Sequence, residues 1–256
     1  MSAYQVVPVK AFSDNYIWTI RDAGRAAVVD AGDAKPVLDY LAAEKLELVA
    51  ILSTHHHNDH VGGNAELLRH YKVPVYGPRD ERIDPVTYRL GEGERFRLPH
   101  FDIEFEVIDC PAHTRTHIAF CGDGMLFCGD TLFAAGCGRL FEGTPEQMHA
   151  ALAKFMRLPD ATRVYCGHEY TLSNIKFAKL TDPGNAALLE LETRAQELRG
   201  KSLPTLPSSI AQEKATNPFV RCTEPAVIAA ASRYAGTTLS DPISVLGAIR
   251  EWKNKS

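Results

Sequence analysis

The sequence has no surplus of basic charge, no long apolar run and no export signal. Its 256 residues include 28 Lys and Arg against 32 Asp and Glu, which gives a formal net charge of −4. This balance argues against nucleic-acid binding, for which a basic surface is expected. No apolar run reaches the roughly 18 residues of a membrane-spanning helix. Residues 1–10 lack the charged-then-apolar pattern of an export signal, so we expect a cytoplasmic protein.

The sequence also lacks a paired cysteine motif. Its six cysteines stand apart from one another, and no two of them form a C-x-x-C pair. Several lie in apolar, strand-like contexts, which predicts buried and reduced thiols. Cys137 and Cys166 lie close to candidate metal-binding motifs, but a better-suited ligand stands beside each of them.

Apolar patterning predicts a strand-rich first two-thirds and a helical remainder. With 45% hydrophobic residues, the chain can bury the core of one large domain or of a domain with an appendage. The expected strands are residues 5–9, 16–20, 26–30, 48–54, 73–76, 103–107, 118–121, 125–128 and 163–166. The expected helices are residues 34–44 after an Asp33 cap, 64–70 after two glycines, 145–156 after a Thr144 capping box, 185–200, 224–235 and 241–253. We expect a domain boundary near residue 172, which gives a metal-binding domain over 1–172 and a helical substrate-binding domain over 173–256.

The most informative segment is Thr54-His55-His56-His57-Asn58-Asp59-His60, which directly follows a predicted buried strand. Extended backbone sends His55 and His57 to one side and His56 to the other. A turn after His57 could bring Asp59 and His60 back toward them. Imidazole and carboxylate groups are zinc ligands, and so many in one loop suggest more than one metal ion.

Three further candidates, His113, Asp130 and His168, each stand at or just after the end of a predicted strand. Loops at strand ends can converge on one rim of a sheet sandwich. Counting the ligands gives one set with His55, His57 and His113 and another with Asp59, His60 and His168, with Asp130 available to both. Three protein ligands per metal and a bridging carboxylate leave a position for water, as in a catalytic site. Taken singly, His113 or His168 would more often be a packed or solvated histidine, and Asp130 could simply cap a turn.

The remaining polar residues near these motifs have weaker assignments. We expect His56, His70, His100 and His149 to be structural or exposed, and His117 to pack near a ligand. Asp30 ends another strand and could orient a ligand histidine, although a turn role fits it nearly as well.

The motifs together resemble the metallo-β-lactamase superfamily and, within it, the glyoxalase II (hydroxyacylglutathione hydrolase) family. The H-x-H-x-D-H loop is typical of the whole superfamily, whereas the Gly-Cys-Gly-Arg block and the helical tail are more specific. The blocks that carry the resemblance are Phe12-Ser-Asp-Asn-Tyr-Ile-Trp18, Thr54-His-His-His-Asn-Asp-His60-Val-Gly-Gly63, Gly129-Asp-Thr-Leu-Phe133, Gly136-Cys-Gly-Arg-Leu-Phe-Glu-Gly143, Cys166-Gly-His-Glu-Tyr-Thr171 and Asn217-Pro-Phe-Val-Arg221.

The resemblance implies an α+β fold, a four-layer αββα sandwich with a small C-terminal helical domain. It implies hydrolysis of S-D-lactoylglutathione and related 2-hydroxyacyl thioesters to glutathione and D-lactate, the second step of methylglyoxal detoxification. A hydroxide that bridges two divalent metal ions would attack the thioester carbonyl, with Asp59 and Asp130 as catalytic ligands. Zinc is the expected metal, and iron or manganese also suit mixed imidazole and carboxylate ligation. We expect a monomer.

The resemblance also implies glutathione contacts from Arg139, Phe141, Tyr170, Arg250 and Lys253. The spacing of Arg250 and Lys253 independently puts them on adjacent positions of the last predicted helix, where two cations could hold a carboxylate. A solvated basic helix end is the alternative. The chain has Phe141 where some relatives have Tyr, Arg139 where some have Lys, and Thr116 where the family often has Gly, which puts the local loop geometry and the substrate affinity in question.

Rival functions share the same metal ligands. A lactonase would need no tripeptide clamp, a phosphodiesterase or nuclease would prefer a basic groove, and a β-lactamase would normally be exported. A persulfide dioxygenase would use a single iron ion with fewer ligands. A metal-dependent binding protein without catalysis also remains open.

Overall fold

The computed structural model describes residues 4–256, which fold into two compact units. Unit 1 comprises the described residues up to Asp109 together with Thr116–Gly129, and unit 2 comprises Cys110–Arg115 and Asp130–Ser256. The expectation about an export signal concerns residues 1–10, of which residues 1–3 lie outside the described residues. The domain boundary expected near residue 172 stays a prediction.

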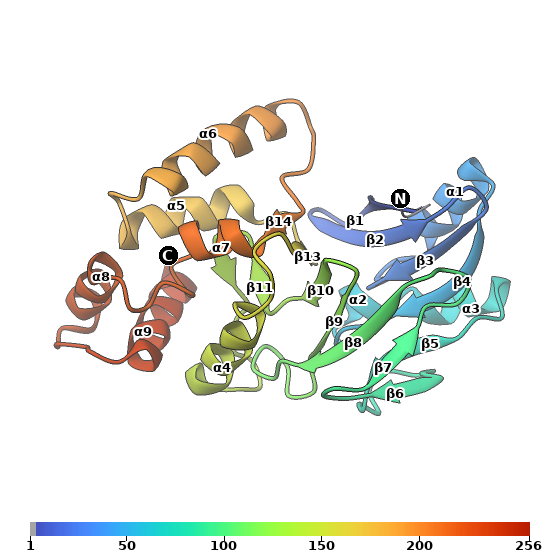
Figure 1. Cartoon of the computed structure of the whole chain (residues 1–256), viewed down its shortest axis with the longest axis horizontal. Helices are drawn as coiled ribbons and strands as arrows, with labels where there is room; N and C mark the ends of the chain where they lie inside the picture. The colour runs from blue at the N-terminus through green and yellow to red at the C-terminus, as the bar shows by residue number, and fades with distance from the viewer. Residues whose placement is uncertain (1–3) are drawn as a thin grey trace. The chain divides into compact units, whose positions relative to one another are not determined.

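Unit 1 contains a mixed sheet whose strand order follows the sequence, β1-β2-β3-β4-β5-β6 (Figure 1). The first three strands pair antiparallel, and the pairs from β3 onward are parallel. Parallel neighbours need a crossover, and the helices α1 (Ala34–Glu44) and α3 (Asn64–His70) lie in the first two. The strands are β1 Gln5–Ala11, β2 Asn15–Arg21, β3 Arg25–Val29, β4 Glu47–Leu52, β5 Val75–Pro78 and β6 Tyr88–Leu90.

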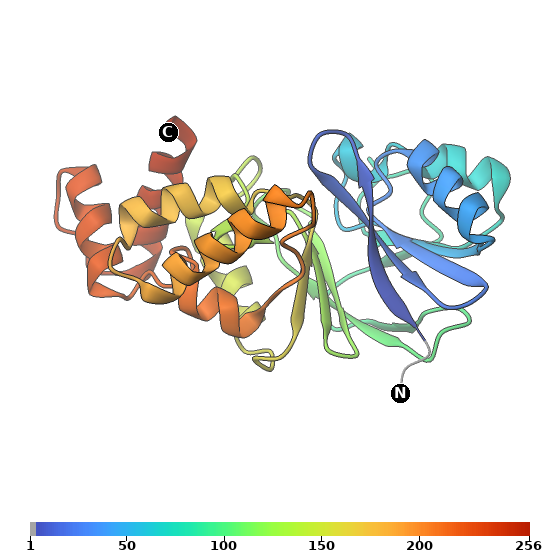
Figure 2. The same cartoon turned by 90° about the horizontal axis from the view of Figure 1, so that it is seen from above.

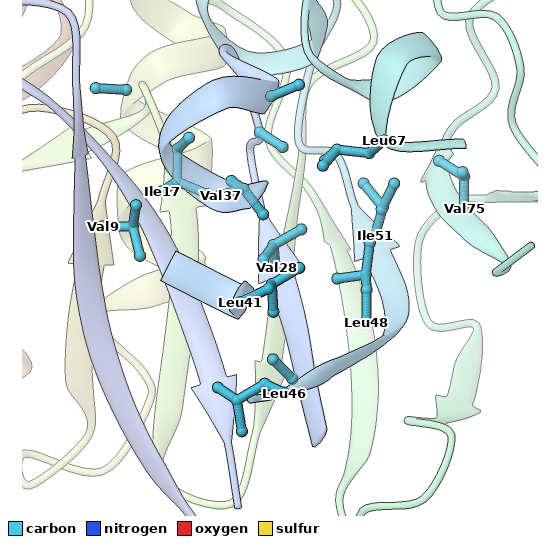
Figure 3. Packing of buried hydrophobic residues seen from close by; sticks show 14 residues of the cluster. Val9, Ile17, Val28, Val37, Leu41, Leu46, Leu48, Ile51, Leu67 and Val75 are labelled. Atoms are coloured by element: carbon cyan, nitrogen blue, oxygen red, sulfur yellow. The ribbon is translucent and has the colours of Figure 1, made fainter. Parts of the chain in front are cut away.

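Helix α1 (Ala34–Glu44) begins where the sequence predicts. The Asp33 side chain accepts a hydrogen bond from the Lys35 amide, and Lys45 ends the helix in a left-handed conformation. α1 and α3 (Asn64–His70) cover one face of the sheet with a shared apolar core (Figure 3). Burial of these aliphatic side chains stabilises the sheet end from which residues 53–60 emerge.

The other sheet strands of unit 1 are antiparallel and lie in the order β10-β9-β8-β7. They are β7 Arg95–Arg97, β8 Glu104–Asp109, β9 Ile118–Gly122 and β10 Met125–Gly129. The predicted hairpin between β9 and β10 is confirmed, and its turn residues Asp123 and Gly124 both have positive φ, as a two-residue hairpin requires. The Tyr76 ring of β5 stacks on Phe96 of β7 at 4.2 Å, so aromatic residues join the two sheets.

Unit 2 is mainly helical. Its helices are α4 Pro145–Phe155, α5 Thr171–Thr181, α6 Ala186–Gly200, α7 Ile210–Thr216, α8 Pro225–Ala235 and α9 Pro242–Lys255. α4 carries the predicted capping box, formed by Thr144 and Gln147. Figures 1 and 2 show α5 and α6 side by side, where they enclose a small apolar core around Ala135. Strand β13 Arg163–Cys166 pairs with β14 Ser208–Ser209, and β11 Leu132–Phe133 forms a hairpin with β12 Gly136–Cys137.

The structure differs from the elements predicted from the sequence in a few places. The strand expected at 73–76 begins at Val75 and runs to Pro78, and the short strands β6, β7, β11, β12 and β14 were not predicted. Such strands are two or three residues long, which is too short for an apolar period to appear. Among residues 4–256, no helix is long and apolar enough to cross a membrane.

Candidate metal and substrate site

The histidine loop of unit 1 gathers its four candidate ligands. The Nε2 atom of His55 lies 3.1 Å from Nδ1 of His57, and the rings of His55 and His60 are 4.1 Å apart. The turn expected after His57 is a short helix, α2 (Asn58–Val61). This helix brings Oδ2 of Asp59 to 3.6 Å from Nε2 of His60. The loop therefore brings together the four residues predicted from its sequence.

Asp30 supports this loop from the end of β3. Its carboxylate accepts hydrogen bonds from the amide and the hydroxyl of Thr54, both at 2.8 Å. Its Oδ2 also lies 3.1 Å from Nδ1 of His60. A carboxylate against one ring nitrogen fixes the tautomer and leaves the other nitrogen for a metal ion. The structure thus places Asp30 as the orienting hypothesis requires.

Asn15 is a supporting residue that the sequence analysis missed. Its Nδ2 donates to Oδ2 of Asp59 at 3.1 Å and to the Asp59 carbonyl oxygen at 3.3 Å. The side chain is buried at the start of β2. Gly32 packs against the Asp59 backbone so closely that a Cβ atom there would collide with it. The only sequence signal was the position of Asn15 inside the Phe12-to-Trp18 block.

Two neighbouring histidines, His117 and His56, lie against other side chains of unit 1. The His117 ring is buried and stacks on His55 with ring centroids 4.5 Å apart. Nδ1 of His56 lies 3.7 Å from Oδ2 of Asp80. Burial of Asp80 favours its neutral form, but hydrogen bonds from Arg82 and Thr116 outweigh burial and hold its pKa well below the usual range. The Thr116 hydroxyl, a departure from the family pattern, therefore has a partner in this chain.

In unit 2, Asp130 joins the other two candidate histidines. Its Oδ2 lies 3.5 Å from Nε2 of His113 and 3.3 Å from Nε2 of His168. Nδ1 of His113 is 2.9 Å from the carbonyl oxygen of Arg139, which again leaves Nε2 as the available nitrogen. Both histidines are 4% exposed and Asp130 is 7% exposed. The structure therefore brings together the three residues expected at separate strand ends.

The donor chemistry of both clusters fits a divalent metal ion. Imidazole and carboxylate ligands with a protein oxygen behind the second ring nitrogen are typical of metal sites. The two buried thiols considered above fit less well, because burial raises the pKa of Cys137 and of Cys166 and so disfavours the thiolate. All seven predicted ligands are among the side chains that could hold a metal ion; they are His55, His57, Asp59, His60, His113, Asp130 and His168.

Three of the expected substrate contacts lie beside the unit 2 histidines. The Phe141 ring is 61% exposed and its centroid is 5.3 Å from that of His113. The Tyr170 ring stacks on His168 at 4.7 Å, with an angle of 3° between the rings. Arg139 is exposed and lends its carbonyl oxygen to His113. A small molecule bound by these three side chains would therefore lie next to the candidate metal-binding histidines.

Arg250 and Lys253 lie in α9, and the structure excludes the alternative of a solvated helix end for Arg250. Arg250 is 4% exposed and its Nη1 donates to the Cys137 carbonyl oxygen at 2.7 Å. Lys253 is partly buried and donates to Oδ1 of Asn174. Burial, followed by the nearby Arg250 charge, lowers the pKa of Lys253 to about 7. A bound carboxylate would raise the pKa of Lys253 and so oppose both effects.

Comparisons with known proteins agree with these observations. The family model described as hydroxyacylglutathione hydrolase C-terminus matches residues 169–256, and the metallo-beta-lactamase superfamily model matches residues 12–168. The chain is 54% identical over 249 residues to a hydroxyacylglutathione hydrolase of Nitrosomonas europaea, covering 97% of this chain and 95% of the relative. It is 53% identical over 254 residues to that of Alkalilimnicola ehrlichii, covering 98% of this chain and 99% of the relative.

Solved structures show the same fold. The crystal structure of ETHE1 from Myxococcus xanthus matches with a TM-score of 0.68 at 23% identity, covering 97% of this chain and 89% of the other. The structure of TTHA1623 in a di-iron-bound form matches with a TM-score of 0.60 at 24% identity, covering 84% of this chain and 99% of the other. The predicted α+β fold with a helical C-terminal region is thus confirmed. Superfamily membership and the two His and Asp clusters together support divalent-metal binding. The chain belongs to the hydroxyacylglutathione hydrolase family of the metallo-β-lactamase superfamily.

Proposed function

We propose that this protein hydrolyses S-D-lactoylglutathione, and related 2-hydroxyacyl thioesters, to glutathione and a 2-hydroxy acid. Family membership supports the reaction class. The observation that carries the substrate assignment is the arrangement in unit 2. There, Tyr170 stacks on His168 and Phe141 contacts His113, while both histidines face one carboxylate oxygen of Asp130. A glutathione moiety bound by these aromatic residues would present its thioester to the metal ligands.

The metal sets proposed from the sequence have the donor chemistry they need. In this proposal His55, His57 and His113 hold one divalent ion, Asp59, His60 and His168 hold the other, and Asp130 serves both. Two zinc ions are the expected occupants, and iron is a serious alternative because a structural relative is described in a di-iron-bound form. Bound metal would lower the pKa of a coordinated water to about 7 and polarise the thioester carbonyl.

The protein's own residues would orient the reactants. Asp30, through Nδ1 of His60, and the Arg139 carbonyl, through Nδ1 of His113, keep the Nε2 atoms of these histidines directed at the metal position. Asn15 holds Asp59 in one conformation through two hydrogen bonds. Such fixed geometry lowers the barrier because no side chain has to reorganise during the reaction.

The tripeptide would be held by side chains of unit 2. Arg139 and Tyr170 are placed beside the candidate ligands, and Arg250 and Lys253 would hold a carboxylate of glutathione. Lys253 Nζ, with its pKa near 7, would take up a proton when that carboxylate arrives. Phe141 offers a ring contact without the hydroxyl found in some relatives.

Three further expectations belong to this proposal. The helical segment from about residue 173 is the substrate-binding domain, and the meeting of the two family models at residues 168 and 169 supports a boundary there. The six cysteines are free thiols, which supports a cytoplasmic location. The active protein is a monomer, which light scattering at the assay concentration would test.

A thiol-release assay tests the proposed activity. The metal-loaded protein should release thiol from S-D-lactoylglutathione much faster than from a thioester without the tripeptide, and should leave a lactone intact. Metal removal by chelation should abolish turnover, and re-addition of zinc, iron or manganese in turn would identify the working metal. Faster hydrolysis of the lactone than of the thioester would show that the substrate assignment is wrong.

A further inference from the structure

Side chains of the helical segment bind the hairpin that β11 and β12 form. Residues 133–137 of this hairpin, called the turn below, are followed by Gly138 and Arg139. Ala135 has a φ of 55°, in the left-handed region that is unfavourable for a residue other than glycine. Gly136 leaves no space for a Cβ atom, because one there would collide with the Asn174 amide. The turn therefore needs outside support to keep this conformation.

Asn217, at the C-terminal end of α7, bonds to both sides of the turn. Its Nδ2 donates to the Phe133 carbonyl oxygen at 3.1 Å and to the Gly136 carbonyl oxygen at 2.9 Å. The same nitrogen lies 2.9 Å from Oε2 of Glu213. The Asn217 side chain is completely buried, so it has no water to replace these partners.

Glu213 binds the apex of the turn. Its Oε2 accepts the Ala135 amide at 3.0 Å, and the side chain is completely buried within α7. A carboxyl group in the interior costs free energy unless its hydrogen bonds offset the loss of water. Glu213 accepts hydrogen bonds from the turn and from Asn217, which an apolar side chain in the same place could not do.

The proposed substrate cations are linked to the same turn, Arg250 directly and Lys253 through Asn174. Asn174 donates to the Ala134 carbonyl oxygen at 3.0 Å and accepts a hydrogen bond from Lys253. Arg250 donates to the Cys137 carbonyl oxygen at 2.7 Å. Every residue from 133 to 137 thus has a backbone group bonded to a side chain of the helical segment. A shift of the turn would move these side chains and the Arg139 segment together.

We propose that Glu213 and Asn217 are positioning residues for the glutathione moiety, which act by holding the 133–137 turn in the conformation that aligns Arg139, Arg250 and Lys253. This inference rests on the proposed function, because it assigns glutathione to those side chains. Neither Glu213 nor Asn217 contacts the substrate or the metal ligands in this account. Their loss should therefore weaken substrate binding and spare the chemical step.

Steady-state kinetics of Glu213→Leu and Asn217→Ala on S-D-lactoylglutathione test this inference. Glu213→Leu keeps an apolar side chain of similar size in the buried position and removes the acceptor for Ala135. Each variant should raise KM, and the inhibition constant of free glutathione, about tenfold, the loss expected for one well-made hydrogen bond. kcat should stay within about threefold of wild type, and the metal content per chain, measured with metal in excess, should be unchanged. Glu213→Gln retains an acceptor oxygen and should return KM to near the wild-type value.

Asn185→Ala provides the matched control. Asn185 is also a helix-end amide of unit 2, and its Nδ2 donates to the Ala215 carbonyl oxygen at 2.8 Å and to Oδ2 of Asp182 at 2.9 Å, not to residues 133–137. It should lower thermal stability about as much as Asn217→Ala does, without a change in KM. An unchanged KM in both Glu213→Leu and Asn217→Ala, or an equal rise in Asn185→Ala, would overturn the inference. A wild-type protein that releases no thiol from the thioester would instead overturn the proposed function.

Discussion

The two candidate ligand clusters are built in opposite ways. In unit 1, His55, His57, Asp59 and His60 come from one loop, and residues distant in the sequence hold that loop in place. In unit 2, His113, Asp130 and His168 come from three separate segments, and Asp130 itself connects them. In the first cluster the ligands are close together in the sequence and the residues that support them are far away. In the second cluster the ligands are far apart in the sequence, and two of them face the third, Asp130. The unit 1 cluster should therefore depend on its supports, and the unit 2 cluster on Asp130.

The largest effect should come from Asp130. Asp130→Ala removes a carboxylate that faces both unit 2 histidines, so we expect loss of metal and a fall in kcat/KM on the order of 10³-fold or more, beyond the 10–100-fold typical of supporting residues. Metal analysis together with the thiol-release assay measures both. In unit 1, Asp59→Ala should lose metal less completely, since three histidines of the loop remain. Full metal content in Asp130→Ala would remove the contrast between the two clusters.

The second effect concerns Glu213, which lies outside both clusters. Burial raises its pKa to about 7 from 4.5, so the folded protein binds a proton that the unfolded chain has released. This contribution to stability is complete below about pH 4.5 and is lost as pH rises through 7. Between pH 5 and 8 the unfolding free energy of wild type should fall relative to Glu213→Gln by about 2.5 kcal/mol. Denaturant unfolding at several pH values measures this difference.

Glu190→Gln is the control for that titration, because Glu190 is an exposed carboxyl of α6. Its pH dependence of stability should match wild type throughout the range. Parallel curves for Glu213→Gln and wild type would mean that Glu213 is ionised in the folded protein at pH 5.

The third effect tests whether the unit 1 loop depends on its supports. Asn15→Ala removes both hydrogen bonds to Asp59 and should weaken metal binding by about 10–100-fold, the usual cost of losing a residue behind a ligand. Competition with a chelator of known affinity measures the change without reference to turnover. Asn15→Asp would place a second carboxylate against Asp59, so it should weaken the unit 1 site further unless the new group itself binds metal. Wild-type metal affinity in Asn15→Ala would show that the loop holds Asp59 without help.

The smallest effect concerns the substrate cations. Lys253→Met should raise KM for the thioester about tenfold near pH 6, where Lys253 carries its proton. Above pH 8 the free protein has lost most of this charge, so the difference from wild type should narrow. KM measured from pH 6 to 9 gives both values. A constant ratio across that range would mean that Lys253 stays charged in the free protein.

The sequence predicts those features whose interacting residues lie close together in the chain. Asp33 caps α1 two residues from its partner, and Thr144 and Gln147 form a capping box within one turn. The alternation of residues 103–107 likewise defines β8 without outside help. The histidine loop was recognisable for the same reason, because all its ligands fall within residues 55–60.

Two of the supporting residues, Asn15 and Asn217, could not be predicted because their partners are far away in the chain. Asn15 bonds a residue 44 positions away, and Asn217 bonds one 84 positions away. Neither has a local pattern that distinguishes it from a capping or exposed asparagine. The resemblance supplied the blocks that contain both residues, and the fold supplied their roles.

The contact between His113 and the Arg139 carbonyl has a consequence for how the protein is loaded. The carbonyl oxygen of Arg139 lies 2.9 Å from Nδ1 of His113, a candidate metal ligand, and the Arg139 side chain is an expected substrate contact. A peptide group that metal binding holds in place is also held in place for substrate binding. By thermodynamic linkage, the factor by which bound metal raises substrate affinity equals the factor by which bound substrate raises metal affinity. A cell poor in metal would therefore hold an enzyme with weaker affinity for its thioester, and abundant thioester would slow the escape of the ions.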